Sequence, residues 1–161
     1  MVMRSAVVRG SNLSAREYPC RDLPRVLDIF DSNVPEFFTA AERQMFADFL
    51  QELPGPYFVV EATHGELVAC GGYALVLEQG PADLCWGMVS RTHHGQGVGR
   101  FLTALRLEAA TADARVRAVV LNTSHLTRGF YERLGFTVER VAVDGIAPGV
   151  DRCDMRLELL R

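Results

Sequence analysis

A glycine-rich segment between a strand-like run and a helix-like run restricts the fold of this chain more than any other feature. Glycines alternate at positions 95, 97 and 99, directly after the apolar residues 83–89. Alternate glycines let the backbone approach a ligand closely, and the start of a helix adds partial positive charge at that point. The segment therefore predicts a strand, a loop and a helix that together bind an anion such as a pyrophosphate. The helical stripe comprises Val98, Phe101, Leu102, Leu105 and Ala109.

The remaining patterns predict one compact domain, residues 1–161, with a mixed sheet covered by helices on both faces. Predicted helices cover residues 22–33, 39–53, 97–112 and 127–135, where Thr39 and Glu42 have capping-box spacing and Thr127 is a candidate cap. Predicted strands cover residues 57–61, 67–77, 83–89, 118–122, 137–143 and 153–160, with an earlier strand at 6–8 or 15–18. Residues 144–151 are predicted to form a loop.

The composition excludes several classes of function. The net charge is -3 and the arginines are scattered, which argues against a nucleic-acid partner. All 17 basic residues are arginine, so neither lysine Schiff-base chemistry nor the phosphate loop of NTPases is available. The four cysteines lie far apart, which predicts reduced thiols rather than a zinc site. With no long apolar segment or leader, we expect a cytoplasmic protein that does not cross a membrane.

A dinucleotide site of the Rossmann type is the main alternative for the glycine loop, and it fits poorly. Arg100 stands where that motif has its third glycine. The strand that follows ends in Leu121 and Asn122 rather than in an acidic residue. The loop therefore favours another phosphate-bearing ligand.

Two motifs resemble those of the GCN5-related N-acetyltransferases. Residues 89–100 resemble the coenzyme A loop of that family, and residues 130–136 resemble its second signature at the expected separation. The resemblance spans residues 16–160. It implies a mixed α/β (α+β) fold with a central, mostly antiparallel sheet of about seven strands flanked by about four helices. One residue departs from the family pattern, since His94 stands where glutamine or arginine is usual.

The resemblance implies acetyl-coenzyme A as the acyl donor and no metal. Backbone amides of the loop would hold the pyrophosphate, and Met88 and Val89 would pair with the pantetheine arm like an added strand. One of these two amides is also the expected donor to the oxyanion. Ser124 stands where many relatives carry an asparagine that touches the cofactor. The implied cofactor-binding residues are Met88, Val89, His94, Gly95, Gln96, Gly97, Val98, Gly99, Arg100, Ser124 and Tyr131.

Catalysis requires a proton for the departing thiolate and a neutral amine. Tyr131 matches the family tyrosine that acts as general acid, although packing beside Phe130 would also explain an aromatic residue there. Asp83 on the strand before the loop and His125 after the next strand are candidate bases. Glu61 is a weaker third candidate, and a chain of water molecules could serve instead. Adjacent His93 and His94 do not form a metal site, because no further ligand stands at motif spacing.

The acceptor is expected between residues 31–38 and 144–151. Candidate substrate residues there are Asn33, Phe37, Asp144, Asp151 and Arg152, for which packing and turn formation are the structural alternatives. The expected reaction is transfer of an acetyl group from acetyl-coenzyme A to a primary amine of a small molecule or an amino acid. The alternatives are a non-catalytic sensor of acyl-coenzyme A and an enzyme that acetylates a protein or peptide amine. A homodimer would pair through an exposed edge at residues 153–160.

Overall fold

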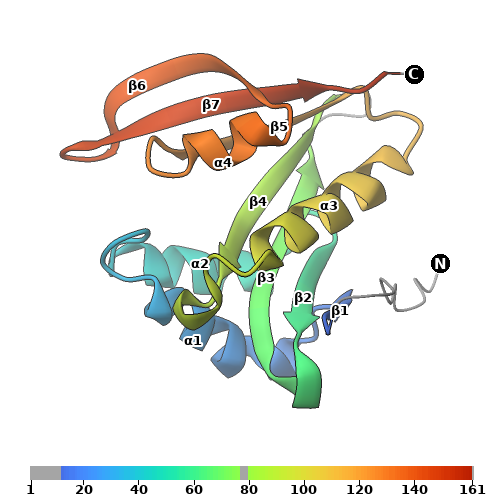
Figure 1. The fold of residues 1–161 in the computed structure, drawn as a ribbon, viewed down its shortest axis with the longest axis vertical. Helices are drawn as coiled ribbons and strands as arrows, with labels where there is room; N and C mark the ends of the chain where they lie inside the picture. Colours follow the sequence, from blue (N-terminus) through green and yellow to red (C-terminus); the bar gives the residue numbers. More distant parts are fainter. Residues whose placement is uncertain (1–11, 77–79, 161) are drawn as a thin grey trace. The chain divides into compact units, whose positions relative to one another are not determined.

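The computed structural model describes residues 12–76 and 80–160, so the candidate strand at residues 6–8 lies outside the described residues. The strands are β1 (Ser14–Glu17), β2 (Tyr57–Glu61), β3 (Leu67–Leu75), β4 (Ala82–Val89), β5 (Ala118–Ser124), β6 (Thr137–Ala147) and β7 (Val150–Glu158), and the α-helices are α1 (Leu23–Ser32), α2 (Glu42–Gln51), α3 (Val98–Thr111) and α4 (Arg128–Arg133) (Figure 1).

The seven strands of the described residues form one sheet in the order β1-β2-β3-β4-β5-β7-β6. Strands β4 and β5 pair in parallel, whereas β1 with β2, β2 with β3, β5 with β7 and β6 with β7 pair antiparallel. This confirms the predicted mixed, mostly antiparallel sheet with four helices.

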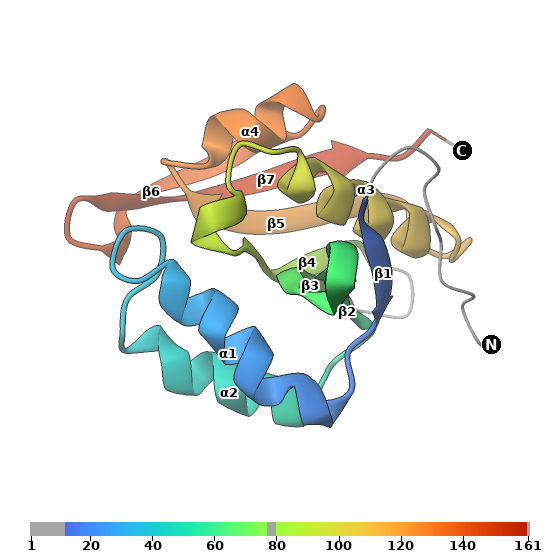
Figure 2. The ribbon, with the colours of Figure 1, turned by 60° about the horizontal axis from the view of Figure 1, so that its bottom comes forward.

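The first compact unit comprises residues 1–73 and 86–106. Helices α1 and α2 cover one face of β2 and β3, and the first part of α3 lies on the other (Figure 2). Helix α1 has Pro24 in its first turn and buries Val26, Ile29 and Phe30 at helical spacing. These three residues pack in one core with Phe46 of α2. On the α3 face, the predicted stripe packs through Val98, Leu102, Phe101 and Leu105 against Ala15, Val60, Val68 and Ala69.

The second compact unit comprises residues 74–85 and 107–161, and its largest feature is a long hairpin of β6 and β7 with α4 alongside (Figure 1). The predicted loop at residues 144–151 is wrong, because both strands continue into it and leave only a tight turn around Gly149, whose φ is 78°. Asp144 has a φ of 54° within a register shift between Ala142 and Ala147. A bulge therefore accommodates the polar and glycine residues that indicated a loop.

Three smaller predictions also change. Strand β7 lies between β5 and β6, so the predicted exposed edge at residues 153–160 is wrong, and Cys153 is buried. The Glu42 carboxylate accepts the Thr39 amide at 2.7 Å as a capping box requires, although α2 begins only at Glu42. The Thr127 hydroxyl donates to the Ser124 carbonyl at 3.3 Å instead of capping α4.

Candidate active site

The glycine loop adopts a conformation that leaves its approach open. Gly95 and Gly97 have φ values of 73° and 82°, and a Cβ atom at either position would meet nothing within 4 Å. The first intrahelical hydrogen bond of α3 runs from the Phe101 amide to the Gly97 carbonyl at 3.1 Å. The amides of the three residues 98–100 therefore lack intrahelical acceptors and stand at the positive end of the helix. This geometry fits the pyrophosphate of a nucleotide cofactor.

The end of β4 is fixed by two side chains that share one acceptor. The Val89 carbonyl accepts a hydrogen bond from Asn33 Nδ2 at 2.9 Å and one from His94 Nε2 at 2.8 Å. Asn33 is only 2% exposed, and its Nδ2 also donates to the Ile29 carbonyl at 2.9 Å. Asn33, expected at the acceptor pocket, thus has its amide group committed to joining α1 to the strand before the loop. His94 reaches back from the loop to the same strand.

Arg91 extends this connection between α1 and the loop. Its amide donates to Ser32 Oγ at 3.0 Å, and its guanidinium forms an ion pair with Glu36. The Arg91 Cζ atom lies 5.3 Å from the centre of the Phe37 ring, which in turn meets the His94 ring edge-on at 5.2 Å. Phe37, another expected substrate residue, therefore supports the loop. The charge of Arg91 is offset by Glu36, whereas the exposed Arg100 has no ion pair within the described residues.

Strand β4 carries a distortion that no sequence pattern predicted. Trp86 has a φ of 44°, in the left-handed region that is unusual for a bulky residue. Its carbonyl accepts the Tyr57 hydroxyl at 2.8 Å, and its ring packs against Phe46 at 5.1 Å between centroids. The parallel ladder with β5 covers Ala82 and Asp83 only. Strain of this kind in a strand is typical of sites where the backbone is shaped for a ligand.

In the second unit, His125 after β5 meets two other predicted residues, Asp144 and Asp151, of the β6–β7 hairpin. The Asp151 amide donates to His125 Nδ1 at 3.0 Å, and the Asp144 amide donates to the Asp151 carboxylate at 3.0 Å. The Asp144 carboxylate accepts the Gly149 amide at 2.7 Å. Because Nδ1 of His125 is an acceptor, the proton of the neutral ring is on Nε2. Neither ring nitrogen then offers a free lone pair, so this arrangement weakens His125 as a candidate base.

Asp83 is a half-buried carboxylate of β4. Burial raises its pKa above the ordinary aspartate value, the charge of Arg152 opposes this shift, and the charge of Asp154 adds to it. Arg152, an expected substrate residue, donates from Nε to Asp154 Oδ1 at 2.8 Å. Glu61 instead forms an ion pair with Arg16 at 2.9 Å, in the first unit. Burial therefore raises the proton affinity of the Asp83 carboxylate, whereas Glu61 is committed to Arg16.

Tyr131 lies on α4 with its ring packed and its hydroxyl unused. The ring meets Phe130 and Phe136 edge-on, with centroids 5.0 and 5.8 Å apart. Both the catalytic and the packing interpretations of Tyr131 thus keep their physical basis, because the hydroxyl has no hydrogen-bond partner within the described residues. Ser124 lies opposite Arg152 in the β5–β7 register, and its carbonyl accepts the Thr127 amide at 3.1 Å.

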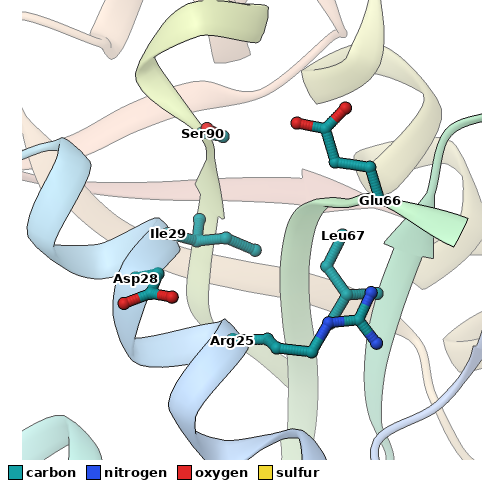
Figure 3. A pocket seen from close by; sticks show the side chains of 6 residues that line it. All are labelled: Arg25, Asp28, Ile29, Glu66, Leu67 and Ser90. Carbon is teal, nitrogen blue, oxygen red and sulfur yellow. The ribbon is translucent and has the colours of Figure 1, made fainter.

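A separate cleft of about 280 Å³ opens beside α1 in the first unit. Figure 3 shows Arg25 extending from α1 toward β3 while Glu66 points away from it. Arg25 Nη2 donates to the Gly65 carbonyl. The cleft carries charges of both signs, and one of its lining residues, Ser90, belongs to the motif at residues 89–100, although none is a predicted cofactor-binding or substrate residue. Its lining residues are Arg25, Asp28, Ile29, Glu66, Leu67 and Ser90.

The described residues offer neither a metal site nor a membrane-spanning helix. No cluster of three or more histidine, cysteine, aspartate or glutamate side chains there could hold a metal ion. Over the same residues, no helix combines the length and the apolar character needed to span a bilayer.

Comparisons with known proteins identify the family and the fold of this chain. The model of the acetyltransferase (GNAT) family matches residues 23–136. No curated protein matches the chain in sequence. Among solved structures, a protein from Desulfovibrio desulfuricans classed as a GNAT-family acetyltransferase is 26% identical, with a TM-score of 0.74 over 91% of this chain and 98% of that one.

Two less similar structures share the fold. The ribosomal-protein-S18-alanine N-acetyltransferase of Escherichia coli is 21% identical, with a TM-score of 0.76 over 92% of this chain and 95% of that one. The spermidine N-acetyltransferase of Vibrio cholerae, solved with CoA and spermine, is 16% identical, with a TM-score of 0.70 over 91% and 95%. The glycine loop, the helix behind it and the family match over most of the chain lead to one conclusion: this chain belongs to the GNAT acetyltransferase family.

Proposed function

We propose that this protein transfers an acetyl group from acetyl-coenzyme A to a primary amine of a small molecule or an amino acid. The observation that carries the proposal is the open glycine loop, in which Gly95 and Gly97 leave room beside three amides without intrahelical acceptors. Membership of the GNAT family supports acetyl-coenzyme A as the ligand of that loop.

The residues of the first unit would bind the donor from its phosphates to its thioester. The amides at the start of α3 and the exposed Arg100 would hold the pyrophosphate. The pantetheine arm would then follow β4 back from the loop. The Ser90 amide donates to the β3 residue Val68 at 2.8 Å, so the Val89 amide points to the opposite side of the strand. The Val89 carbonyl already accepts two hydrogen bonds. We therefore assign the Val89 amide as the group that pairs with acetyl-coenzyme A.

The chemical step needs a proton acceptor and a proton donor. When bound, acetyl-coenzyme A supplies an acetyl group that is activated as a thioester. Asp83 would accept a proton from the incoming ammonium, directly or through water, and its raised pKa suits that task. As the new C–N bond forms and the C–S bond breaks, the Tyr131 hydroxyl would give its proton to the departing sulfur, and the second proton that the nitrogen loses would return to the Tyr131 oxygen. The products are an acetylated amine and free coenzyme A.

The first test is ligand binding measured by thermal shift. Coenzyme A and acetyl-coenzyme A should raise the melting temperature, because a ligand that binds only the native state stabilises it by mass action. NAD should not. Selective stabilisation by NAD would sink the proposal in favour of a dinucleotide enzyme.

The second test is turnover, followed as free thiol release across a panel of amines. Small polyamines, aminoglycosides and amino acids test the small-molecule proposal, and a peptide with a free N-terminal alanine tests the alternative of a peptide amine. Replacing Tyr131 with phenylalanine should lower kcat by about 100-fold, in the range typical of a general acid, with little change in acetyl-coenzyme A binding. If the protein binds acetyl-coenzyme A but acetylates no member of the panel, and if the Tyr131 substitution does not change the rate of thiol release, the protein would instead be a sensor.

A further inference from the structure

Helix α3 buries an arginine that lies outside every motif considered above. Arg106 is 2% exposed and ranks among the largest fully buried side chains of the described residues. Its Nε atom is buried and has no hydrogen-bond partner there, and no described carboxylate forms an ion pair with the side chain. The apolar stripe predicted for α3 gave no indication of this, because Arg106 adjoins Leu105 on the side toward the sheet.

Two glycines make room for the Arg106 guanidinium against the sheet. A Cβ atom at Gly87 would lie 2.7 Å from both Nη1 and Nη2 of Arg106, and one at Gly71 would lie 3.3 Å from Nε and Cζ. Any side chain at Gly87 would therefore displace the guanidinium. A Cβ at Gly71 would also lie 3.1 Å from the Gly87 Cα. The charge thus rests on bare backbone of β3 and β4.

The Cys70 thiol interacts electrostatically with Arg106 but does not neutralise its charge. Burial raises the pKa of the Cys70 thiol to about 12, although a hydrogen bond from Tyr57 and the charge of Arg106 act in the opposite direction. Cys70 is therefore uncharged near neutral pH and supplies no counter-ion. A guanidinium stays protonated in proteins, and a buried charge without a partner destabilises the native state. A hydrophobic side chain of similar volume would cost less.

We propose that Arg106, cradled by Gly71 and Gly87, is a recognition site for a carboxylate carried by one of the two substrates. A carboxylate can accept two parallel hydrogen bonds from the guanidinium and supplies the negative charge that the described side chains around Arg106 do not provide. This inference rests on the proposed function, under which the donor follows β4 from Val89 toward Gly87. The acyl end then lies beside Arg106, and the acceptor amine meets that acyl end. The carboxylate can belong to the acyl group or to the acceptor, and the test separates the two sources.

The test measures binding, so it does not depend on turnover. For the first source, calorimetry compares succinyl-coenzyme A with acetyl-coenzyme A. For the second, protein saturated with coenzyme A is titrated with a panel of amino acids and the matching amines that lack the α-carboxylate. We expect the carboxylate-bearing member of one series to bind at least about tenfold more tightly to the wild type, as one charge-assisted hydrogen bond would give.

Variants separate recognition from structure. Arg106→Met should abolish the preference and raise the melting temperature of the unliganded protein, because it removes an unpaired buried charge. Arg106→Lys keeps the charge without the fork and should retain only part of the preference. Arg21→Met, which removes an exposed positive charge of the same unit that forms no ion pair within the described residues, should change neither quantity.

Each outcome decides the question. Equal binding of both members in both series by the wild type would overturn the carboxylate site, and this comparison needs no variant. A preference that survives Arg106→Met would overturn the role of Arg106. If neither coenzyme A nor acetyl-coenzyme A binds, the proposed function itself fails, whereas normal binding without a carboxylate preference removes only this inference.

Discussion

The shared acceptor at the end of β4 makes a quantitative prediction. The Val89 carbonyl accepts Asn33 Nδ2 and His94 Nε2, so either donor alone keeps it paired. Asn33→Ala removes the two short hydrogen bonds of Nδ2, at 2.9 Å to the Val89 and Ile29 carbonyls, and a longer one at 3.4 Å to Ser32 Oγ, but the Ile29 carbonyl keeps the Ser32 hydroxyl at 2.7 Å. At about 1 kcal/mol for each short bond, we expect a loss of about 2 kcal/mol in the free energy of unfolding.

The double variant should cost more than the sum of the single ones. His94→Ala removes one hydrogen bond of an exposed residue, which we expect to cost about 0.5 to 1 kcal/mol. With both donors gone, the Val89 carbonyl is left unpaired, which adds about 1 to 2 kcal/mol for a partly buried acceptor. The coupling arises because the Val89 carbonyl keeps one donor in each single variant and loses its last donor only in the double variant.

The assay is urea denaturation of the wild type, both single variants and the double variant. Asn33→Asp is the matched control, because it keeps the shape of the side chain but places carboxylate oxygens against two carbonyls. It should be at least as destabilised as Asn33→Ala at pH 7 and should recover near pH 4, where a protonated carboxyl can donate. Energies that add within about 0.5 kcal/mol would refute the shared-acceptor reasoning.

Three further predictions concern single residues. Burial disfavours the charged form of Asp22, yet the ion pair with Arg16 and the charge of Arg25 outweigh it and lower the pKa. Its contribution to stability is therefore complete above the ordinary aspartate pKa of about 4 and is lost as the pH falls. Asp22→Asn should cost about 2 kcal/mol of unfolding free energy at pH 7 and should flatten the fall in stability toward low pH, measured by denaturation from pH 7 to 3. An unchanged fall in stability toward low pH would contradict this. The raised pKa of Asp83 has the opposite sign, so Asp83→Asn should raise the melting temperature at pH 7 but not at pH 3, while lowering turnover; equal effects at both pH values would exclude a buried charge as the cause. Gly97→Ala and the control Gly65→Ala face the same backbone penalty of about 1 kcal/mol, since the φ values of the two glycines are 82° and 77° with open space around both. Only Gly97→Ala should weaken acetyl-coenzyme A binding, by about tenfold or more in calorimetry. Equal affinities of the two variants would argue against the loop as the phosphate site.

The local patterns of the sequence predicted most of the elements but not their ends. Periodicity placed α1, α3 and β2 within a few residues, because an apolar stripe at the right spacing buries itself in the same way wherever the element packs. The hairpin of β6 and β7 was misread around Asp144, where polar and glycine residues are as compatible with a bulge as with a loop. Choosing between these requires the register of β6 against β7, which the residue types around Asp144 do not record.

The sequence by itself determined the glycine loop before α3 and the family, because the alternate glycines, the helix start and the second motif act over short distances along the chain. Only the tertiary structure decided which side chains support that loop. Asn33 reaches Val89 across 56 positions, and Arg106 meets Gly87 only because α3 packs on the sheet. Hydrogen bonds and burial of this kind depend on how elements pack, and a linear pattern does not record which residues come into contact.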